Sequence, residues 1–537
     1  MGGDKMRVTL SDGLRSQAAH QPDKIAAVEV ATERTFTYKE FNERTNRLAN
    51  GLMSLGLAKG DHIAHWIPNC IEMCDITFAA AKNGVVFATV NPGYVAREAE
   101  YLIDHWDAEA LILDVDMIGK VQEIQAKLPK VKHFIVTGPK DKTPVDMINY
   151  DELLANSSPE EPQTPMSETD EYICFYTSGT TGLPKAPVRD QGSVISLAFG
   201  IVIDQGFLRS TNDISLLCGP GFHAGPWVFG VMAPLFFGRS VVIQKTFRPE
   251  EALANIEKYK CTDLWLVPVM LNFIANLPDD VRKKYDVSSL KVISTSGAPL
   301  HVAARQKTAE TFPGVEHWDF YGISEYGAPI VICPEQAGKA PSVGRPCIGG
   351  DARIVDPFTP DPVYGRQMPR GEVGEIWVKN PAGFLYYYKN PGETKRVRKV
   401  YPNGEVWFTA EDMGYEDKEG FFYMTDRKKD MINRGGETIM PQELEGVMME
   451  HPKVLECAVI GVPNDTFGEE PRMIVALRQG KTATEKELLD WMRGKIAKFK
   501  MPNGVDFVEA LPKTGSGKIL KKDLREPYWK GKEKRVH

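Results

Sequence analysis

Short apolar runs separated by helical segments recur through the first 300 residues of this chain. The runs begin at Ala110, His133, Glu171, Ser240, Asp263 and Lys291. Between them, apolar side chains repeat at helical spacing, as in 38–55, where Gly56 stands at the expected C-cap, and in 97–106. Alternation of strand and helix over this length predicts mostly parallel sheets covered by helices.

The pattern changes at Gly371. Short strand-like runs with glycine and charged turns cover 371–378, 404–414 and 420–427, and they predict antiparallel β structure. The charged stretch 426–437 is typical of a hinge, and a compact α+β pattern begins after it at Pro441. We therefore expect a large domain over residues 1–428 and a small one over 429–537, with the hinge near Lys429.

Composition excludes several classes of protein. A chain of 537 residues can bury several cores, and 42% hydrophobic with 26% charged residues excludes a disordered or fibrous chain. The net charge of −7 gives no overall attraction to nucleic acid or anionic membranes. The eight cysteines lack zinc-site spacing, which favours reduced thiols. With no signal-peptide core and no membrane-spanning run, we expect a cytoplasmic protein.

The strongest local signal is the run YTSGTTGLPK at 176–185, which directly follows an apolar strand-like run. Glycines let backbone N–H groups turn toward one anion, hydroxyls add donors, and Lys185 adds a positive charge. It is not a Walker A loop, because the Gly-Lys-Ser/Thr ending is absent. A Ser/Thr-rich surface loop is the alternative, which so many specified positions disfavour. The predicted phosphate ligands are Thr177, Ser178, Gly179, Thr180, Thr181 and Gly182, with Lys185.

This run resembles the phosphate-loop signature of the adenylate-forming, AMP-binding superfamily, which holds acyl-CoA synthetases, non-ribosomal adenylation domains and luciferases. Seven further segments follow the family order between Tyr38 and Lys518. The resemblance implies an α/β, multi-layer N-terminal domain with two parallel-sheet subdomains and a small β-barrel-like subdomain, and a small mobile α+β C-terminal domain. It also implies that the protein uses ATP, Mg²⁺ and coenzyme A.

Three of these segments are similar to the family's nucleotide-binding motifs. They are STSGAP at 294–299, FYGISE at 320–325 and WFTAEDMG at 407–414. An aromatic ring can stack on adenine, a carboxylate can accept both ribose hydroxyls, and another can hold Mg²⁺. The residues implied for ATP and AMP here are Ser296, Gly297, Ala298, Tyr321, Gly322, Ser324, Asp412 and Arg427, with Glu325 as the metal ligand.

The resemblance assigns the moving parts to the second domain. Lys518, in LPKTGSGK at 511–518, matches the lysine that contacts the carboxylate and the α-phosphate, and it joins Lys185 and Glu325 as catalytic. A solvated lysine in a basic tail is the alternative, which the full PKTxSGK spacing disfavours. Lys429 matches the hinge, and Gly435 and Gly436 match the loop that lines the coenzyme A tunnel.

The segment GFHAGPW at 221–227 bears on the substrate. His223 stands where amino-acid-activating domains carry an aspartate, so an amino acid is disfavoured. Trp227 resembles the gate tryptophan of fatty-acyl-CoA synthetases, and an ordinary core tryptophan is an equal alternative. With Ile323, these residues are the predicted acyl pocket.

Two segments depart from the family pattern. Ala410 and Glu411 stand where the family has Thr-Gly, which puts nucleotide affinity and loop geometry in doubt. Residues 186–191, APVRDQ, replace Gly-Val-x-x-Thr-His after the phosphate loop, and there we expect altered packing more than lost chemistry.

Together the motifs predict ATP-dependent activation of a carboxylic acid, of the fatty, alkyl or aryl type, to acyl-AMP and then acyl-CoA, with release of AMP and pyrophosphate. Two alternatives stay open: an adenylation enzyme that loads a separate carrier protein, and a nucleotide-binding pseudoenzyme. The small-molecule partners are the acid, ATP and coenzyme A, and we expect a monomer or homodimer without nucleic acid partners.

Overall fold

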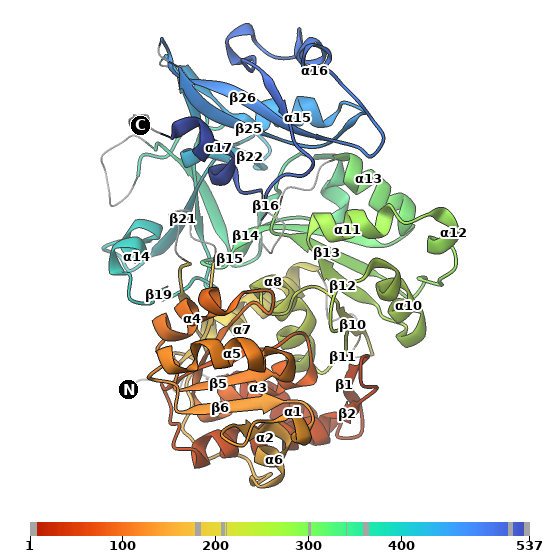
Figure 1. Cartoon of the computed structure of the whole chain (residues 1–537), viewed down its shortest axis with the longest axis vertical. Coiled ribbons are helices and arrows are strands. Elements are labelled where there is room, and N and C mark those ends of the chain that lie inside the picture. The colour runs from red at the N-terminus through yellow and green to blue at the C-terminus, as the bar shows by residue number, and fades with distance from the viewer. Residues whose placement is uncertain are drawn as a thin grey trace. The chain divides into compact units, whose positions relative to one another are not determined.

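The computed structural model describes residues 8–177, 184–205, 210, 212–298, 302–339, 341–357, 365–435, 437–464, 466–513 and 519–530. These belong to two compact units, one made of 1–351 with 378–408 and the other of 352–377 with 409–537 (Figure 1). This division follows internal packing. The predicted boundary near Lys429 concerns motion and stays a prediction.

One large mixed sheet of the first unit carries several predicted strands. Its order is β16 (Arg345–Pro346), β15 (Gly327–Ile332), β14 (Glu316–Ile323), β13 (Val292–Ser296), β12 (Asp263–Leu266), β10 (Ile214–Leu217), β11 (Ser240–Ile243), β1 (Ile25–Glu29) and β2 (Thr35–Thr37). Strands β14 to β1 in this order are parallel, and the antiparallel pairs lie at the edges. The parallel pairing predicted from the apolar runs is confirmed.

The second sheet of this unit is also mostly parallel. Its order is β19 (Tyr386–Tyr387), β9 (Pro187–Asp190), β8 (Glu171–Phe175), β4 (Val86–Thr89), β3 (His62–Trp66), β5 (Ala110–Asp114), β6 (His133–Thr137) and β7 (Ile148–Asn149). From β8 to β7 the strands are parallel, whereas β9 and β19 are antiparallel to their neighbours. Strands that are distant in sequence therefore lie side by side.

Helices surround these sheets. They are α1 (Leu10–His20), α2 (Tyr38–Ser54), α3 (Ile71–Asn83), α4 (Ala96–His105), α5 (Ile118–Ile124), α6 (Tyr150–Ala155), α7 (Gln191–Gln205), α8 (Ala224–Trp227), α9 (Ala233–Phe236), α10 (Pro249–Tyr259), α11 (Pro268–Ala275), α12 (Asp279–Arg282), α13 (Val302–Thr311) and α14 (Pro391–Val397). A π-helical stretch, 228–232, joins α8 to α9. One continuous hydrophobic cluster contains side chains of α1–α3 and of both sheets.

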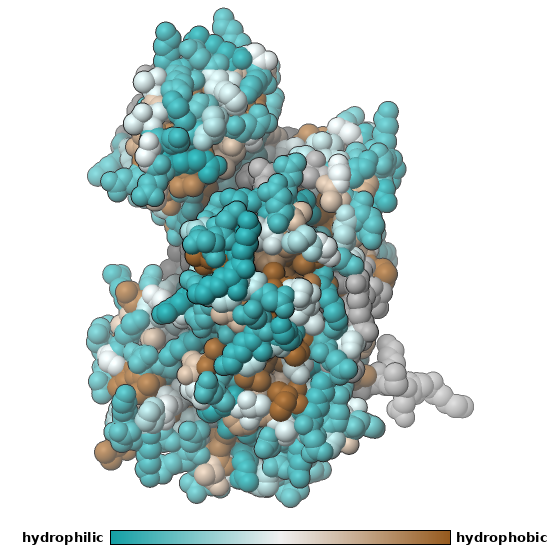
Figure 2. Space-filling view, turned by 90° about the vertical axis from the view of Figure 1, so that its right-hand side faces the viewer, coloured by the Kyte–Doolittle hydropathy of each residue, from teal (hydrophilic) through white to brown (hydrophobic). Residues whose placement is uncertain are grey.

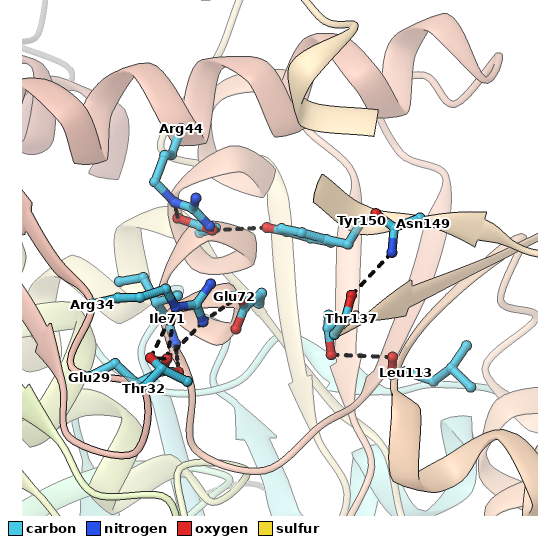
Figure 3. A network of polar contacts seen from close by, with 12 residues as sticks. Glu29, Thr32, Arg34, Arg44, Ile71, Glu72, Leu113, Thr137, Asn149 and Tyr150 are labelled. Atoms are coloured by element: carbon cyan, nitrogen blue, oxygen red, sulfur yellow. Dashed lines mark hydrogen bonds and ion pairs between the residues drawn. The ribbon is translucent and has the colours of Figure 1, made fainter. Parts of the chain in front are cut away.

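Helix α3 is buried on every side, as expected for a helix inside a core. Its charged residues are paired: Glu72 with Arg34 at 2.8 Å and Asp75 with Arg44 at 2.6 Å. Figure 3 shows Arg34 between Glu72 and Glu29, a residue of β1. Lys82 donates to Asn42 at 2.7 Å, and burial lowers the pKa of its ammonium group to about 8. These pairs offset the cost of burying charge.

Two further sheets remain: one has strands in both units, and the other lies in the second unit. The strands β17 (Asp351–Val355), β18 (Gly374–Lys379), β21 (Val406–Glu416) and β20 (Arg398–Val400) form one sheet, with β22 (Phe422–Arg427) paired to β21. β18 and β21 each begin in one unit and end in the other. The antiparallel structure predicted for this region is confirmed where β22 pairs with β21.

The C-terminal part is the predicted α+β structure. Its strand order is β24 (Glu437–Ile439), β23 (Ile432–Arg434), β26 (Gly468–Leu477) and β25 (Val454–Asn464), with β27 (Val505–Phe507) paired to β26. The helices are α15 (Pro441–Met449), α16 (Glu485–Met492) and α17 (Lys521–Trp529). Side chains of α15 and α16 join one hydrophobic cluster with β25 and β26, and side chains of α17 join another with the same strands.

Among the residues described, no helix combines the length and the apolarity that a bilayer crossing requires. The face shown in Figure 2 is mostly hydrophilic, and its apolar residues lie in small separate groups.

The buried pair of Arg44 and Asp75 gives a stability prediction. Asp75 is fully buried and also accepts from the Tyr150 hydroxyl at 3.0 Å. We expect Arg44→Met to lower the free energy of unfolding by about 3 kcal/mol, because it leaves a buried carboxylate without its cation. Arg44→Met combined with Asp75→Asn should recover much of the loss, and Arg15→Met, in an exposed pair, should cost far less. Urea unfolding of the four proteins measures this, and equal effects of Arg44→Met and Arg15→Met would contradict it.

Candidate active site

The predicted phosphate loop begins and ends at one antiparallel bridge. Thr177 and Lys185 exchange two backbone hydrogen bonds, at 2.9 and 3.0 Å, between the end of β8 and the start of β9. The chain therefore leaves and re-enters the sheet at one point, as a loop that surrounds an anion must. The predicted ligands Ser178, Gly179, Thr180, Thr181 and Gly182 lie outside the described residues.

The side chain of Lys185 is held by α14. Its ammonium group pairs with the Glu393 carboxylate and lies 5.5 Å from the centre of the Tyr387 ring. The Asn390 side chain caps α14 by accepting from the Glu393 N–H at 3.1 Å, which places Glu393 in the first turn. Hydrogen bonds from Arg396 and then Lys185 hold the pKa of Glu393 at about 2, although burial raises it.

Glu325 lies in the turn between β14 and β15, and it is 6% exposed. The Tyr387 hydroxyl donates to its carboxylate at 2.6 Å, and the Phe384 N–H donates to its backbone carbonyl at 2.7 Å. The turn requires glycine at 322, because a Cβ there would lie 1.8 Å from the Gly327 carbonyl oxygen. Lys185 and Glu325, far apart in sequence, thus meet at one residue, Tyr387.

The carboxylate of Glu325 fits Mg²⁺ that is bound together with phosphates. No group of three or more His, Cys, Asp or Glu able to hold a metal occurs among the described residues. Mg²⁺ does not need such a group, because it is usually held by one or two carboxylates and by substrate phosphates. Glu325, a buried and oriented carboxylate, meets that requirement.

Arg189 is a component of the site that the sequence motifs did not reveal. It is buried in β9 and donates to the Ser324 carbonyl from Nε at 3.1 Å and from Nη2 at 2.6 Å, and to the Ala382 carbonyl from Nη1. Burial lowers the pKa of its guanidinium to about 10. Position 189 is unspecified in the family pattern over 186–191, so no motif pointed to this arginine. Tyr387 and Glu393 had no signal, because neither belongs to a motif.

The residues predicted to contact adenine lie at one edge of the first sheet. Ser296 ends β13 and pairs with Phe320 of the parallel strand β14, so Ser296 lies next to the strand that carries Tyr321. Gly297 has a φ of +88°, the left-handed region that favours glycine. The Tyr326 hydroxyl donates to the Tyr321 hydroxyl at 3.2 Å, which orients that ring. Ser324 follows on the same turn.

Two of the residues predicted for the acyl pocket, His223 and Trp227, lie at the two ends of one short segment. Asn69 accepts from the Gly221 N–H and donates to the Gly219 carbonyl, both at 2.8 Å, and so fixes the loop before His223, the N-cap of α8. Trp227 is fully buried, and its indole N–H donates to the Thr77 hydroxyl at 2.9 Å. In this structure Trp227 packs as a core residue, and its role as a gate stays a prediction.

The third residue predicted for this pocket lies on β14. Ile323 pairs with Gly327 across the hairpin of β14 and β15. The rings of Phe229 and Phe320 lie 5.4 Å apart, and both belong to the hydrophobic core beside this strand.

The second unit holds the other predicted residues. Asp412 is buried on β21, and its backbone is the cross-strand partner of Arg427 on β22, so the two predicted ribose contacts are neighbours. The side chains of Arg427 and Lys429 lie outside the description, and so do residues Gly436 and Lys518.

Gly435 has a defined structural role. It has a φ of +61°, and its N–H donates to the Phe467 carbonyl at 2.8 Å in the turn between β23 and β24. The predicted contact of this turn with coenzyme A stays a prediction.

The backbone at Glu411 shows how the chain accommodates a residue other than the family's glycine at this position. It has a φ of +60°, the left-handed conformation that glycine adopts readily and other residues rarely. Its N–H donates to the Thr409 hydroxyl at 2.9 Å, and that hydroxyl donates to Glu375. The backbone therefore keeps the shape suited to glycine, although the side chain is larger. This is strain at a candidate functional loop.

We expect Glu411→Gly to raise the free energy of unfolding by about 0.5–1 kcal/mol, because relief of left-handed strain exceeds the entropy that glycine costs. Glu411→Val should lower it, since a β-branched residue resists this φ. Thermal unfolding of both variants is the measurement. A less stable Glu411→Gly variant would show that the side chain of Glu411 contributes more than the strain costs.

The chain is similar to known protein families over most of its length. The family model described as AMP-binding enzyme matches residues 14–388, and the model of the AMP-binding enzyme C-terminal domain matches residues 443–518. The crotonobetaine/carnitine–CoA ligase of Proteus mirabilis (strain HI4320) is 31% identical over 508 residues, 92% of this chain and 93% of the relative. The feruloyl-CoA synthase of an Amycolatopsis species is 30% identical over 495 residues, 92% of this chain and 94% of the relative.

A solved structure agrees with these relatives. The ATP-bound crystal structure of MatB from Rhodopseudomonas palustris has a TM-score of 0.86 at 26% identity, with 97% of this chain and 99% of that chain covered. The fold, the closed base of the phosphate loop and the matched models lead to one conclusion: the chain belongs to the AMP-binding enzyme family.

Proposed function

We propose that this chain activates a fatty, alkyl or aryl carboxylic acid. It is an AMP-forming acid–thiol ligase, which converts the acid to acyl-AMP and then to acyl-CoA. The observation that carries the proposal is the cluster in which Tyr387 contacts both Lys185 and Glu325 beside the closed base of the phosphate loop.

In the first half-reaction, the carboxylate of the acid attacks the α-phosphate of ATP, and pyrophosphate leaves. This transition state needs alignment and charge neutralisation more than acid–base catalysis. Lys185 would hold the departing pyrophosphate, and its move from Glu393 to the phosphates exchanges one anionic partner for another. Lys518 would contact the carboxylate and the α-phosphate, while Asp412 and Arg427 hold the ribose.

Glu325 would hold the magnesium ion that accompanies ATP. When bound, the ion neutralises charge on the phosphate oxygens. The protein contributes a carboxylate oriented by Tyr387 and shielded from water, and a low local dielectric strengthens its attraction for the ion.

In the second half-reaction, the thiol of coenzyme A attacks the acyl carbonyl and AMP leaves. We propose that rotation at Lys429 withdraws the loop of Lys518 and brings the Gly435–Gly436 turn to the coenzyme A tunnel. One set of nucleotide contacts then serves two transition states through a conformational step.

The proposed acid class has support from the acyl side. Phe229, Phe320 and Trp265 form a buried aromatic cluster beside β14, the strand that ends at the predicted acyl residue Ile323. The Amycolatopsis relative is named for feruloyl-CoA, an aryl thioester. His223, in place of an aspartate, offers no carboxylate to an α-amino group.

A panel of carboxylic acids tests the function. We expect alkyl or aryl acids to support ATP–pyrophosphate exchange and then consumption of coenzyme A, and amino acids to support neither. Exchange without coenzyme A consumption, but with acylation of a carrier protein, would support the carrier-loading alternative. No exchange with any acid would contradict the enzyme proposal.

Lys518→Ala separates the two half-reactions. We expect it to slow adenylation by roughly 10²–10³-fold, the effect of losing one preorganised charge-stabilising donor, and to spare thioester formation from supplied acyl-AMP. The two rates are measured by pyrophosphate exchange and by thiol consumption. An equal loss in both would contradict the assigned role.

A further inference from the structure

We propose that Arg189 and Tyr387 are positioning residues that hold Glu325 ready for a divalent cation, Tyr387 at the carboxylate and Arg189 at the preceding carbonyl. This rests on the proposed role of Glu325 as the metal ligand. It assigns a purpose to Arg189, which stands at an unspecified position of the family pattern over 186–191, a segment for which the sequence predicts only altered packing.

Tyr387 fixes the carboxylate itself. Its side chain is 3% exposed, and its hydroxyl donates to Oε1 of Glu325 at 2.6 Å. Among the described residues no donor bonds to Oε2, the oxygen that the proposal assigns to the cation. The donor is a neutral hydroxyl, which orients a carboxylate without cancelling its charge, as a lysine or arginine would.

Three consecutive carbonyl oxygens of the turn are also held. The Ser324 carbonyl accepts from Arg189, the Glu325 carbonyl from the Phe384 N–H at 2.7 Å, and the Tyr326 carbonyl from the Asn380 side chain at 3.0 Å. Arg189 also donates to the Ala382 carbonyl, so it ties the 380–387 segment to the same turn. The backbone of residues 324–326 is thus held by a hydrogen bond at each carbonyl.

Arginine at position 189 does more than fill space in the core. Arg189 is 3% exposed, and its hydrogen bonds in the described structure go to carbonyl oxygens, not to a carboxylate. A buried cation without a directly bonded anion is costly. Its planar fork, however, reaches two carbonyls at once, which the ammonium of lysine cannot do in the same geometry. We infer that the fixed positions of the Ser324 and Ala382 carbonyls offset the cost of burying this guanidinium.

Tyr387→Phe tests the carboxylate contact, and Tyr386→Phe is its matched control. Both tyrosines lie on β19, and each hydroxyl donates to a glutamate at 2.6 Å, that of Tyr386 to Glu171. Binding of Mn²⁺ with ATP, in the absence of acid, is read by electron paramagnetic resonance. We expect Tyr387→Phe to weaken it by about 10-fold or more, as for other residues that orient metal ligands, and Tyr386→Phe to leave it within about twofold.

Arg189→Lys tests the backbone contact. We expect it to raise the Mg²⁺ concentration needed for half-maximal pyrophosphate exchange by about 10-fold. Thioester formation from supplied acyl-AMP, which involves no pyrophosphate, should stay near wild type. Unchanged metal dependence in both Arg189→Lys and Tyr387→Phe, or equal losses in Tyr387→Phe and Tyr386→Phe, would overturn the proposal. If the wild type shows no exchange with any acid, the proposed function fails, and Mn²⁺ binding with ATP still decides the positioning.

Discussion

The complete burial of α3 is the constraint on which the first unit depends. The helix belongs to a hydrophobic cluster that contains side chains from both sheets, so its charged residues must find partners inside the protein. Arg34, Arg44 and Glu161 supply them. The same helix fixes the acyl side of the site, because Thr77 accepts from Trp227 and Asn69, just before α3, holds the loop that precedes His223.

The phosphate side of the predicted site depends on how the strands pair. Parallel strands bring the ends of β8, β13 and β14 to sheet edges, which explains how motifs far apart in sequence become one site. Antiparallel additions then complete it: β9 brings Lys185 back to Thr177, and β19 brings Tyr387 to Glu325. Lys185 and Glu325 therefore lie where parallel and antiparallel pairing meet.

The negative net charge makes these local arrangements necessary. ATP and coenzyme A are anionic, and a chain with a net charge of −7 weakly opposes their approach. Lys185 is paired with Glu393, so the lysine proposed to hold the phosphates is already oriented. Preorganisation of this kind lowers the cost of ordering the side chain when the nucleotide binds.

Spacing within the chain was sufficient for the alternating strands of the first part and for the antiparallel strands after Gly371, because each depends on residues close in sequence. It left Trp227 undecided and did not reveal Arg189, Tyr387 or Glu393. Their partners are between 62 and 208 residues away, and no local pattern encodes such contacts. Only folding removes water from these groups, and each must then bond to whichever partner the sheets bring within reach.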